Sequence, residues 1–184
     1  VDNWNPDIIG LSNYCWNANL SKIVFQYTKR KNPKVICVSG GPEFPTDKEE
    51  CKNYLLKRNE IDFYVYREGE IAFTTLIQKI RKGMGINILK SDPQAGVMNI
   101  HPKTKELIVG ESIPRITNLD EIPSPYLTGL FDKFFDGILT PVIQTTRGCP
   151  FNCTYCQDGQ DYYNKISRFS VLPTYRFPSF TLFR

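Results

Sequence analysis

Three cysteines lie within eight residues of one another, and their spacing could hold a metal centre. They are Cys149, Cys153 and Cys156, in the stretch TTRGCPFNCTYCQDG. Gly148 and Pro150 can bend this loop so that its thiolates wrap one side of a cluster. A [4Fe-4S] cluster accounts for the number of cysteines, because three thiolates leave one iron open for a ligand that is not protein.

Two other readings of these cysteines remain open. A structural zinc site normally offers four ligands, and the single histidine, His101, falls in a predicted hairpin of another domain. A non-catalytic zinc- or iron-sulfur-binding module is therefore the alternative function. A redox pair made of Cys153 and Cys156 would leave Cys149 unexplained. The other cysteines are scattered, and Cys37 is expected to be a buried apolar residue: Cys15, Cys37 and Cys51.

The cysteine spacing, with Tyr155 before the last cysteine, resembles the signature of radical S-adenosylmethionine (SAM) enzymes. The resemblance implies that Cys149, Cys153 and Cys156 hold a [4Fe-4S] cluster whose open iron chelates SAM. Reductive cleavage then gives methionine and a 5′-deoxyadenosyl radical, with an electron donor such as flavodoxin or ferredoxin. Tyr155 matches the aromatic residue near the adenine of SAM, and plain packing is its alternative role. No catalytic residue beyond the cluster ligands is implied.

The first 82 residues repeat a strand followed by a helix three times, which is typical of a parallel α/β sheet. Strands are predicted over 7–12, 34–41 and 62–68, and the second helix begins at Thr46 or Asp47 as N-cap. The predicted sheet-facing residues of the first helix are Leu20, Ile23, Val24 and Tyr27. Those of the third helix are Phe73, Leu76, Ile77 and Ile80, with Gly83 at its C-cap.

The later segments predict a hairpin, a linker and a second domain. Residues 96–111 alternate apolar and polar side chains around a turn, which favours a β-hairpin with His101 in its turn. Residues 112–137 begin with a proline-rich stretch and form the predicted linker. A strand over 138–146 then leads into the cysteines.

Small or charged residues follow each of the three predicted strands, where ligands of open parallel sheets bind. They are Ser12, Gly40-Gly41-Pro42 and the run 67–70. From the residues alone, tight turns explain them as well as a ligand does. The stretches GLSNY, SGGPEFP and YREGEIAF, placed ahead of the cysteines, resemble the cobalamin-binding domain of B12-dependent radical SAM proteins. This resemblance implies that Ser12, Gly40 and Gly41 line the pocket for the cobalamin nucleotide tail.

The expected architecture is a Rossmann-like, flavodoxin-type parallel sheet over 1–111, followed by the first part of a radical SAM (β/α) barrel over 138–184. The family's Asp-x-His-x-x-Gly loop is not in the sequence, and we expect the first domain to be incomplete at its N-terminus. The tail from Val171 lacks a helical period, so a truncated or frame-shifted barrel that does not turn over is expected. The resemblance implies a methyltransferase, and another cobalamin-independent radical reaction is the alternative.

The charge and the apolar content of the sequence narrow the classes of partner that we expect. The 23 basic and 19 acidic residues give a charge of +4, too small and dispersed for a nucleic-acid footprint. No apolar run approaches the roughly 18 residues that cross a bilayer, so a cytoplasmic location without membrane contact is expected. The substrate, a small molecule or a macromolecule, is not specified by these residues.

Overall fold

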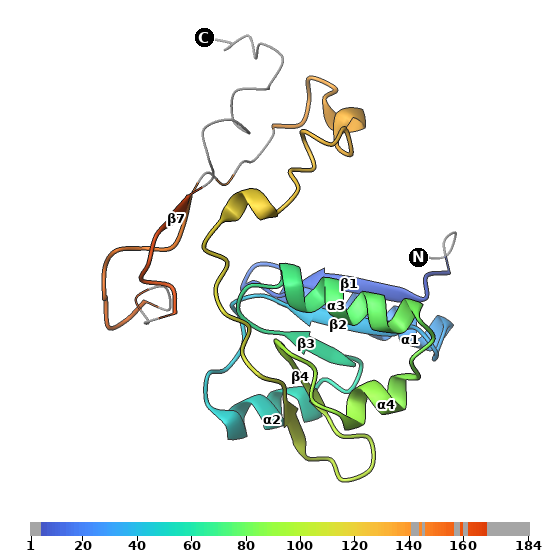
Figure 1. Ribbon diagram of the computed structural model, residues 1–184. Coiled ribbons are helices and arrows are strands. Elements are labelled where there is room, and N and C mark those ends of the chain that lie inside the picture. Colours follow the sequence, from blue (N-terminus) through green and yellow to red (C-terminus); the bar gives the residue numbers. More distant parts are fainter. Residues whose placement is uncertain (1–4, 141–143, 145, 157–158, 160–161, 169–184) are drawn as a thin grey trace. The chain divides into compact units, whose positions relative to one another are not determined.

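We describe the protein from a computed structural model. The structure describes residues 5–140, 144, 146–156, 159 and 162–168 (Figure 1). The chain forms two compact units, Val1–Pro114 and Arg115–Arg184. Each unit is described by itself below. The predicted tail from Val171 lies outside the described residues.

The first unit is built on a mixed sheet of five strands in the order β1-β2-β3-β4-β5. β1 (Ile8–Ser12), β2 (Ile36–Gly40) and β3 (Phe63–Val65) are parallel, whereas β4 (Val97–Ile100) and β5 (Leu107–Val109) continue the sheet in antiparallel pairing. The predicted Rossmann-like sheet is thus confirmed. β2 and β3 are almost entirely buried, because the inner strands of such a sheet are covered on both faces.

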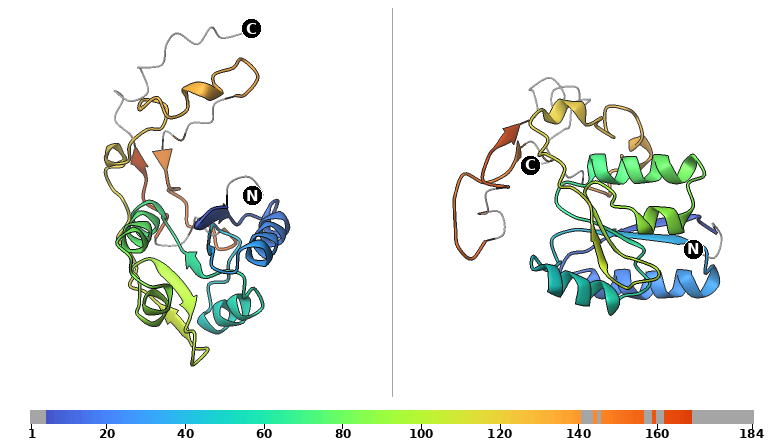
Figure 2. Two further views of the ribbon diagram at one scale, coloured as in Figure 1. Left: turned by 90° about the vertical axis from the view of Figure 1, so that its right-hand side faces the viewer. Right: turned by 60° about the horizontal axis from the view of Figure 1, so that its bottom comes forward.

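Helices cover the two faces of this sheet in pairs (Figure 2). α1 (Ala18–Lys31) and α2 (Lys48–Leu56) lie on one face, and α3 (Glu70–Arg81) and α4 (Ile86–Ser91) lie on the other. α2 begins where its sequence predicts, because the Asp47 carboxylate accepts hydrogen bonds from the backbone N–H groups of Glu49 and Glu50. The short helix α4 was not predicted.

The face of α1 that packs on the sheet differs from the predicted one. Ser21, Phe25 and Thr28 are buried, whereas Leu20 and Ile23 are 64% and 60% exposed. Two polar residues can face the sheet because their hydroxyls are satisfied locally. Ser21 Oγ donates to the Ser12 carbonyl at 2.9 Å, and Thr28 Oγ1 donates to the Val24 carbonyl at 2.8 Å.

The face of α3 was predicted more closely. Leu76 is buried in the main apolar core with Phe63, and Ile80 packs against that core. Phe73, by contrast, is 37% exposed and lies against Gly10 of the edge strand β1. Gly83 follows the helix with a positive φ of 82°, as the predicted C-cap requires.

A buried ionic cluster ties the amino ends of the strands to two helices. Asp62, only 6% exposed, precedes β3 and accepts from Lys29 Nζ at 2.6 Å and from Lys90 Nζ at 3.2 Å. Its Oδ2 also accepts from the Cys37 backbone N–H at 2.9 Å. The cluster therefore joins the C-terminal end of α1, the C-terminal end of α4, β2 and β3.

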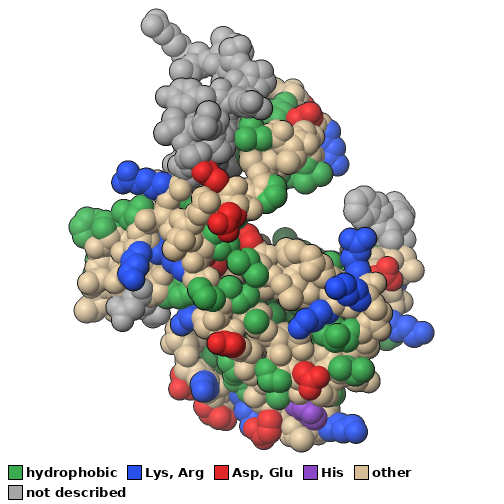
Figure 3. Space-filling view, in the orientation of Figure 1, with side chains coloured by type: hydrophobic (Ala, Val, Ile, Leu, Met, Phe, Trp, Pro, Cys, Tyr) green, Lys and Arg blue, Asp and Glu red, His purple; other side chains and the backbone are tan. Residues whose placement is uncertain are grey.

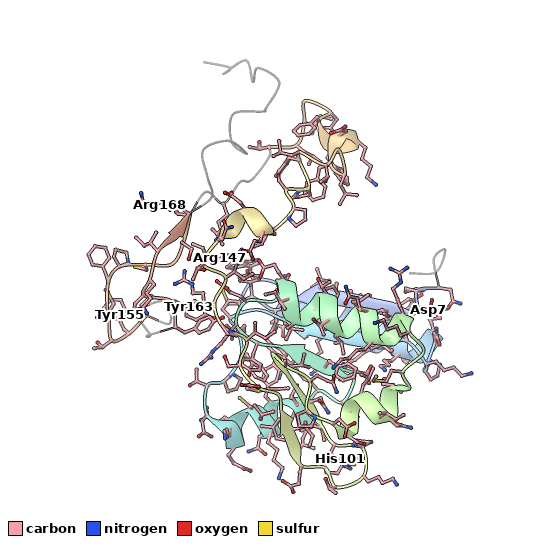
Figure 4. All side chains as sticks on the ribbon, viewed as in Figure 1. Asp7, His101, Arg147, Tyr155, Tyr163 and Arg168 are labelled. Atoms are coloured by element: carbon pink, nitrogen blue, oxygen red, sulfur yellow. The ribbon has the colours of Figure 1, made fainter. Side chains whose placement is uncertain are left out.

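The predicted hairpin is formed by β4 and β5, and His101 is one of its turn residues. His101 Nδ1 accepts from the backbone N–H groups of Lys103 and Thr104, at 3.2 and 3.1 Å. Figure 4 shows His101 at the hairpin, among side chains of the first unit.

Regular structure is sparse in the described part of the second unit. It comprises the single-turn helices η1 (Leu119–Glu121) and η2 (Asp132–Phe134) and the paired strands β6 (Thr146–Arg147) and β7 (Ser167–Arg168). The strand predicted over 138–146 is wrong for residues 138–140 and 144, which are not in a strand. Ile138 is 85% exposed, because no neighbouring strand pairs with this segment among the described residues. The described residues of the second unit do not show the expected start of a (β/α) barrel.

Candidate functional site

The residues predicted from the first and second strands lie side by side at the carboxyl ends of the sheet. The parallel register pairs Ser12 of β1 with Gly40 of β2, and Gly40 with Val65 of β3. We call this row the carboxyl edge. Ser12 is exposed there, and its hydroxyl accepts from Asn17 Nδ2 at 2.8 Å. The structure thus brings together Ser12, Gly40 and Gly41, as the sequence predicts.

Residues 40–44, the double-glycine turn, are fastened to Asn13 by backbone and side-chain hydrogen bonds. The Asn13 backbone N–H donates to the Gly40 carbonyl at 2.7 Å, and the Asn13 carbonyl accepts from the Glu43 N–H at 3.1 Å. Asn13 Nδ2 donates to the Glu43 carbonyl as well. Asn13 is only 3% exposed, so its amide is committed to these internal partners.

Tyr64 of β3 supports the same turn from inside the sheet. Its hydroxyl accepts from Asn13 Nδ2 at 3.0 Å and donates to the Gly41 carbonyl at 2.7 Å. Its ring stacks on Phe44 with a centroid distance of 3.7 Å and an interplanar angle of 14°. Tyr54 of α2 meets Phe44 edge to face and accepts a further hydrogen bond from Asn13.

Burial raises the pKa of the Tyr64 and Tyr54 hydroxyls, and the Asn13 hydrogen bonds oppose this rise only in part. Both hydroxyls therefore stay protonated at neutral pH. The Tyr64 hydroxyl therefore remains a hydrogen-bond donor to the Gly41 carbonyl at neutral pH.

The two glycines are required by the neighbouring backbone. Gly41 has a positive φ of 137°, and a Cβ there would collide with the Asn13 carbonyl oxygen. A Cβ on Gly40 would lie 2.9 Å from the Val65 carbonyl oxygen. Tight turn geometry therefore accounts for both glycines without a ligand.

The carboxyl edge exposes a pair of aromatic rings just after β1. Tyr14 and Trp16 stack with their centroids 4.6 Å apart, and Trp16 is 76% exposed. Large exposed aromatic rings beside a strand end can contact a flat apolar ligand. The sequence reasoning missed this pair, together with Asn13 and Tyr64. The run of polar and aromatic residues directly after Ser12 was the available signal.

The third predicted stretch, 67–70, lies at the same end of β3. Arg67 has a positive φ of 63°, and its guanidinium donates to Ser112 Oγ. Glu70 is in the first turn of α3, where a carboxylate interacts favourably with the helix dipole. These contacts match the structural reading of this stretch as a turn into a helix.

In the second unit, the three cysteines lie in the loop of residues 148–156, which we call the cysteine loop. All three thiols are free, Cys149 and Cys153 half-buried and Cys156 exposed. The Cys156 N–H donates to the Cys153 carbonyl at 3.1 Å, which makes a tight turn between them. Among the described residues, no three His, Cys, Asp or Glu side chains are arranged to hold a metal ion. Tyr155 is 91% exposed and points away from the loop (Figure 4).

Arg115 binds the base of the cysteine loop. Its guanidinium donates to the carbonyls of Arg147, at 2.7 Å, and of Tyr162 and Lys165. The Cys149 N–H donates to the Tyr163 carbonyl at 3.0 Å, beside the same contacts. Gly148 has a φ of 102°, and a Cβ there would collide with Arg115 and with the Lys165 carbonyl.

On the face shown in Figure 3, both acidic and basic side chains are exposed. In the described residues, no helix has the length and apolar character to cross a bilayer.

Comparison with known proteins finds similarity to a domain family and to longer enzymes. Residues 1–77 match the B12 binding domain family. The chain is 27% identical over 176 residues to the cobalamin-dependent radical SAM methyltransferase TokK of Streptomyces tokunonensis, covering 89% of this chain and 24% of that protein. It is 30% identical over 165 residues to the 2-(S-pantetheinyl)-carbapenam-3-carboxylate methyltransferase of Streptantibioticus cattleyicolor, covering 84% of this chain and 22% of that enzyme.

A solved structure confirms the fold. The apo form of OxsB, a cobalamin-dependent SAM radical enzyme, superimposes with a TM-score of 0.63 at 21% identity, covering 94% of this chain and 22% of OxsB. The chain thus spans about a quarter of the length of these relatives.

Proposed function

We propose that the carboxyl edge binds cobalamin within a radical SAM enzyme, because residues 1–77 match the B12 binding domain family and the chain is similar to cobalamin-dependent radical SAM methyltransferases. The observation that carries the proposal is the row of Ser12 and Gly40 at adjacent strand ends, beside the exposed Trp16. Ligands of open α/β sheets bind at this end of the strands.

The described residues fit a large flat ligand at this edge. Gly40 and Gly41 place no side chain there, and the exposed Ser12 hydroxyl can turn to a polar group of a nucleotide tail. Trp16 offers an apolar face for contact with a ring. Cobalamin would supply a transferable methyl group, while these side chains bind and orient it.

We further propose that Cys149, Cys153 and Cys156 hold a [4Fe-4S] cluster that cleaves SAM. Three free thiols of suitable chemistry support the proposal, although they are not gathered as ligands. The turn between Cys153 and Cys156 brings the backbones of these two cysteines together through the bond from the Cys156 N–H to the Cys153 carbonyl. Tyr155, exposed beside them, is available to contact the adenine of SAM.

Titration of the chain with hydroxocobalamin tests the first proposal. We expect saturable binding of one cobalamin per chain, read by equilibrium dialysis and by quenching of tryptophan fluorescence. Gly41→Val should abolish binding, since its side chain would distort the turn, while Gly83→Val, with nothing within 4 Å, is the matched control. Absence of binding to a chain that circular dichroism shows to be folded would refute the proposal.

Anaerobic reconstitution with iron and sulfide tests the proposal that the three cysteines hold a cluster. A brown chromophore with about four irons per chain is expected, and alanine at Cys149, Cys153 or Cys156 should remove it. The Cys15→Ala variant should retain it, because Cys15 lies in the first unit. A colourless protein with stoichiometric zinc would favour the zinc module instead.

A further inference from the structure

The double-glycine turn is fixed by several hydrogen bonds from residues outside it. Its Gly40, Gly41 and Glu43 carbonyls each accept a hydrogen bond from Asn13 or Tyr64, and its Glu43 N–H donates to Asn13. Asn13 and Tyr64 are 3% and 0% exposed. Neither side chain reaches solvent, so both act only through the turn and its neighbours.

The supports come from two different strands. Asn13 directly follows β1, and Tyr64 lies in β3, on either side of the strand that leads into the turn. A hydrogen-bonded chain runs from Asn13 Nδ2 through the Tyr64 hydroxyl to the Gly41 carbonyl. The turn therefore takes its conformation from the flanking strands as well as from its own sequence.

We propose that Asn13 and Tyr64 are positioning residues that preset the double-glycine turn for its ligand. The inference rests on the proposed cobalamin site. A preset turn reduces the ordering cost of binding, so loosening it weakens affinity even though neither side chain touches the ligand.

The first unit provides a matched pair of variants. Tyr64→Phe removes the hydroxyl that donates to the Gly41 carbonyl at 2.7 Å. Tyr66→Phe removes a hydroxyl that donates to the Gly110 carbonyl at 2.8 Å, outside the turn. Each variant loses one buried or half-buried hydroxyl with a carbonyl partner, and only Tyr64 supports the turn.

Two readouts separate positioning from general stability. In Tyr64→Phe we expect hydrogen exchange of the Glu43 amide to rise roughly 5-fold, and hydroxocobalamin affinity to fall by about the same factor, as loss of one net hydrogen bond implies. In Tyr66→Phe both should stay within about 2-fold, after thermal unfolding has been measured for each variant. Phe44→Leu, which removes the stack from a half-buried position, should act like Tyr64→Phe and serves if that variant does not fold.

Equal effects of Tyr64→Phe and Tyr66→Phe, or no effect of Tyr64→Phe on Glu43 exchange, would overturn the inference. If the unaltered chain binds no cobalamin, the proposed function fails, and Glu43 exchange still decides whether the turn is preset. Faster exchange with unchanged cobalamin affinity would retain the support of the turn and refute its role in binding.

Discussion

Lys29 Nζ lies 2.6 Å from Asp62 Oδ2, which joins the C-terminal end of α1 to the residue before β3. Asp62 also pairs with Lys90, so one carboxylate is shared by two ammonium groups whose side chains are 22% and 18% exposed. We expect Asp62→Asn to lower the free energy of unfolding by about 2–3 kcal/mol, because it leaves two half-buried cations without a counter-charge. Urea unfolding measures this difference.

The Lys52–Glu106 pair is the control for that prediction. Its atoms are 2.8 Å apart, but the Glu106 side chain is 66% exposed. Glu106→Gln should therefore cost less than about 1 kcal/mol. Equal losses in both variants would show that burial does not set the contribution of Asp62.

Backbone strain predicts the consequence of adding a methyl group to the double-glycine turn. Gly41→Ala combines a positive φ with a collision against the Asn13 carbonyl, so we expect a loss of at least about 2 kcal/mol in stability. Gly83→Ala has a positive φ in open space and should cost about 1 kcal/mol. A chemical denaturation curve for each variant checks the order, and a reversed order would contradict the collision expected at residue 41.

The buried thiol of Cys37 predicts a loss of stability in alkali. Burial raises the pKa of Cys37 from 9.0 to about 12, so the unfolded chain loses its proton first as pH rises above 9.0. The contribution of this protonated thiol to the free energy of unfolding is complete below pH 9.0. It should decline by about 1.4 kcal/mol per pH unit toward pH 12.

Unfolding curves between pH 8 and 11 should therefore show a shallower decline for Cys37→Ala than for the unaltered chain. Val38→Ala creates a cavity in the same buried strand and leaves the Cys37 thiol in place. It should lower the free energy of unfolding at every pH and keep the pH slope of the unaltered chain. Equal slopes in the unaltered chain and Cys37→Ala would refute the role of this thiol.

Arg115 predicts how the cysteine loop responds when its base is loosened. Arg115→Gln removes the cation that binds three carbonyls, at Arg147, Tyr162 and Lys165. We expect the reconstituted chain to hold less than half of the iron bound by the unaltered chain, measured by iron analysis after gel filtration. Arg58→Gln, which removes a guanidinium stacked on Tyr54 in the first unit, should leave iron content unchanged.

Much of the first unit could be predicted because its signals are local. The apolar runs around Ile36 and Phe63 form inner strands, and Asp47 caps α2 as its position indicates. The burial of Ser21 could not be predicted, since its acceptor is the Ser12 carbonyl at the end of β1. Thr28 bonds to the Val24 carbonyl within α1, but its burial depends on which helix face the sheet covers. An apolar pattern alone assigns Leu20 to the core and leaves these hydroxyls out.

The candidate site shows the same limit. Ser12 and Gly40 could be placed at one edge because parallel strands end together. Tyr64 could not be linked to Gly41, because the hydrogen bond between them spans 23 residues and depends on the strand register. The strand predicted over 138–146 is wrong for residues 138–140 and 144 for a related reason: a strand persists only where a neighbour completes its ladder.

β1 borders the sheet and pairs only with β2 among the described residues. Its outer row of peptide groups is a template for adding a further strand. Samples of this chain at high concentration should therefore self-associate. Mild solubilising conditions would keep such preparations monodisperse.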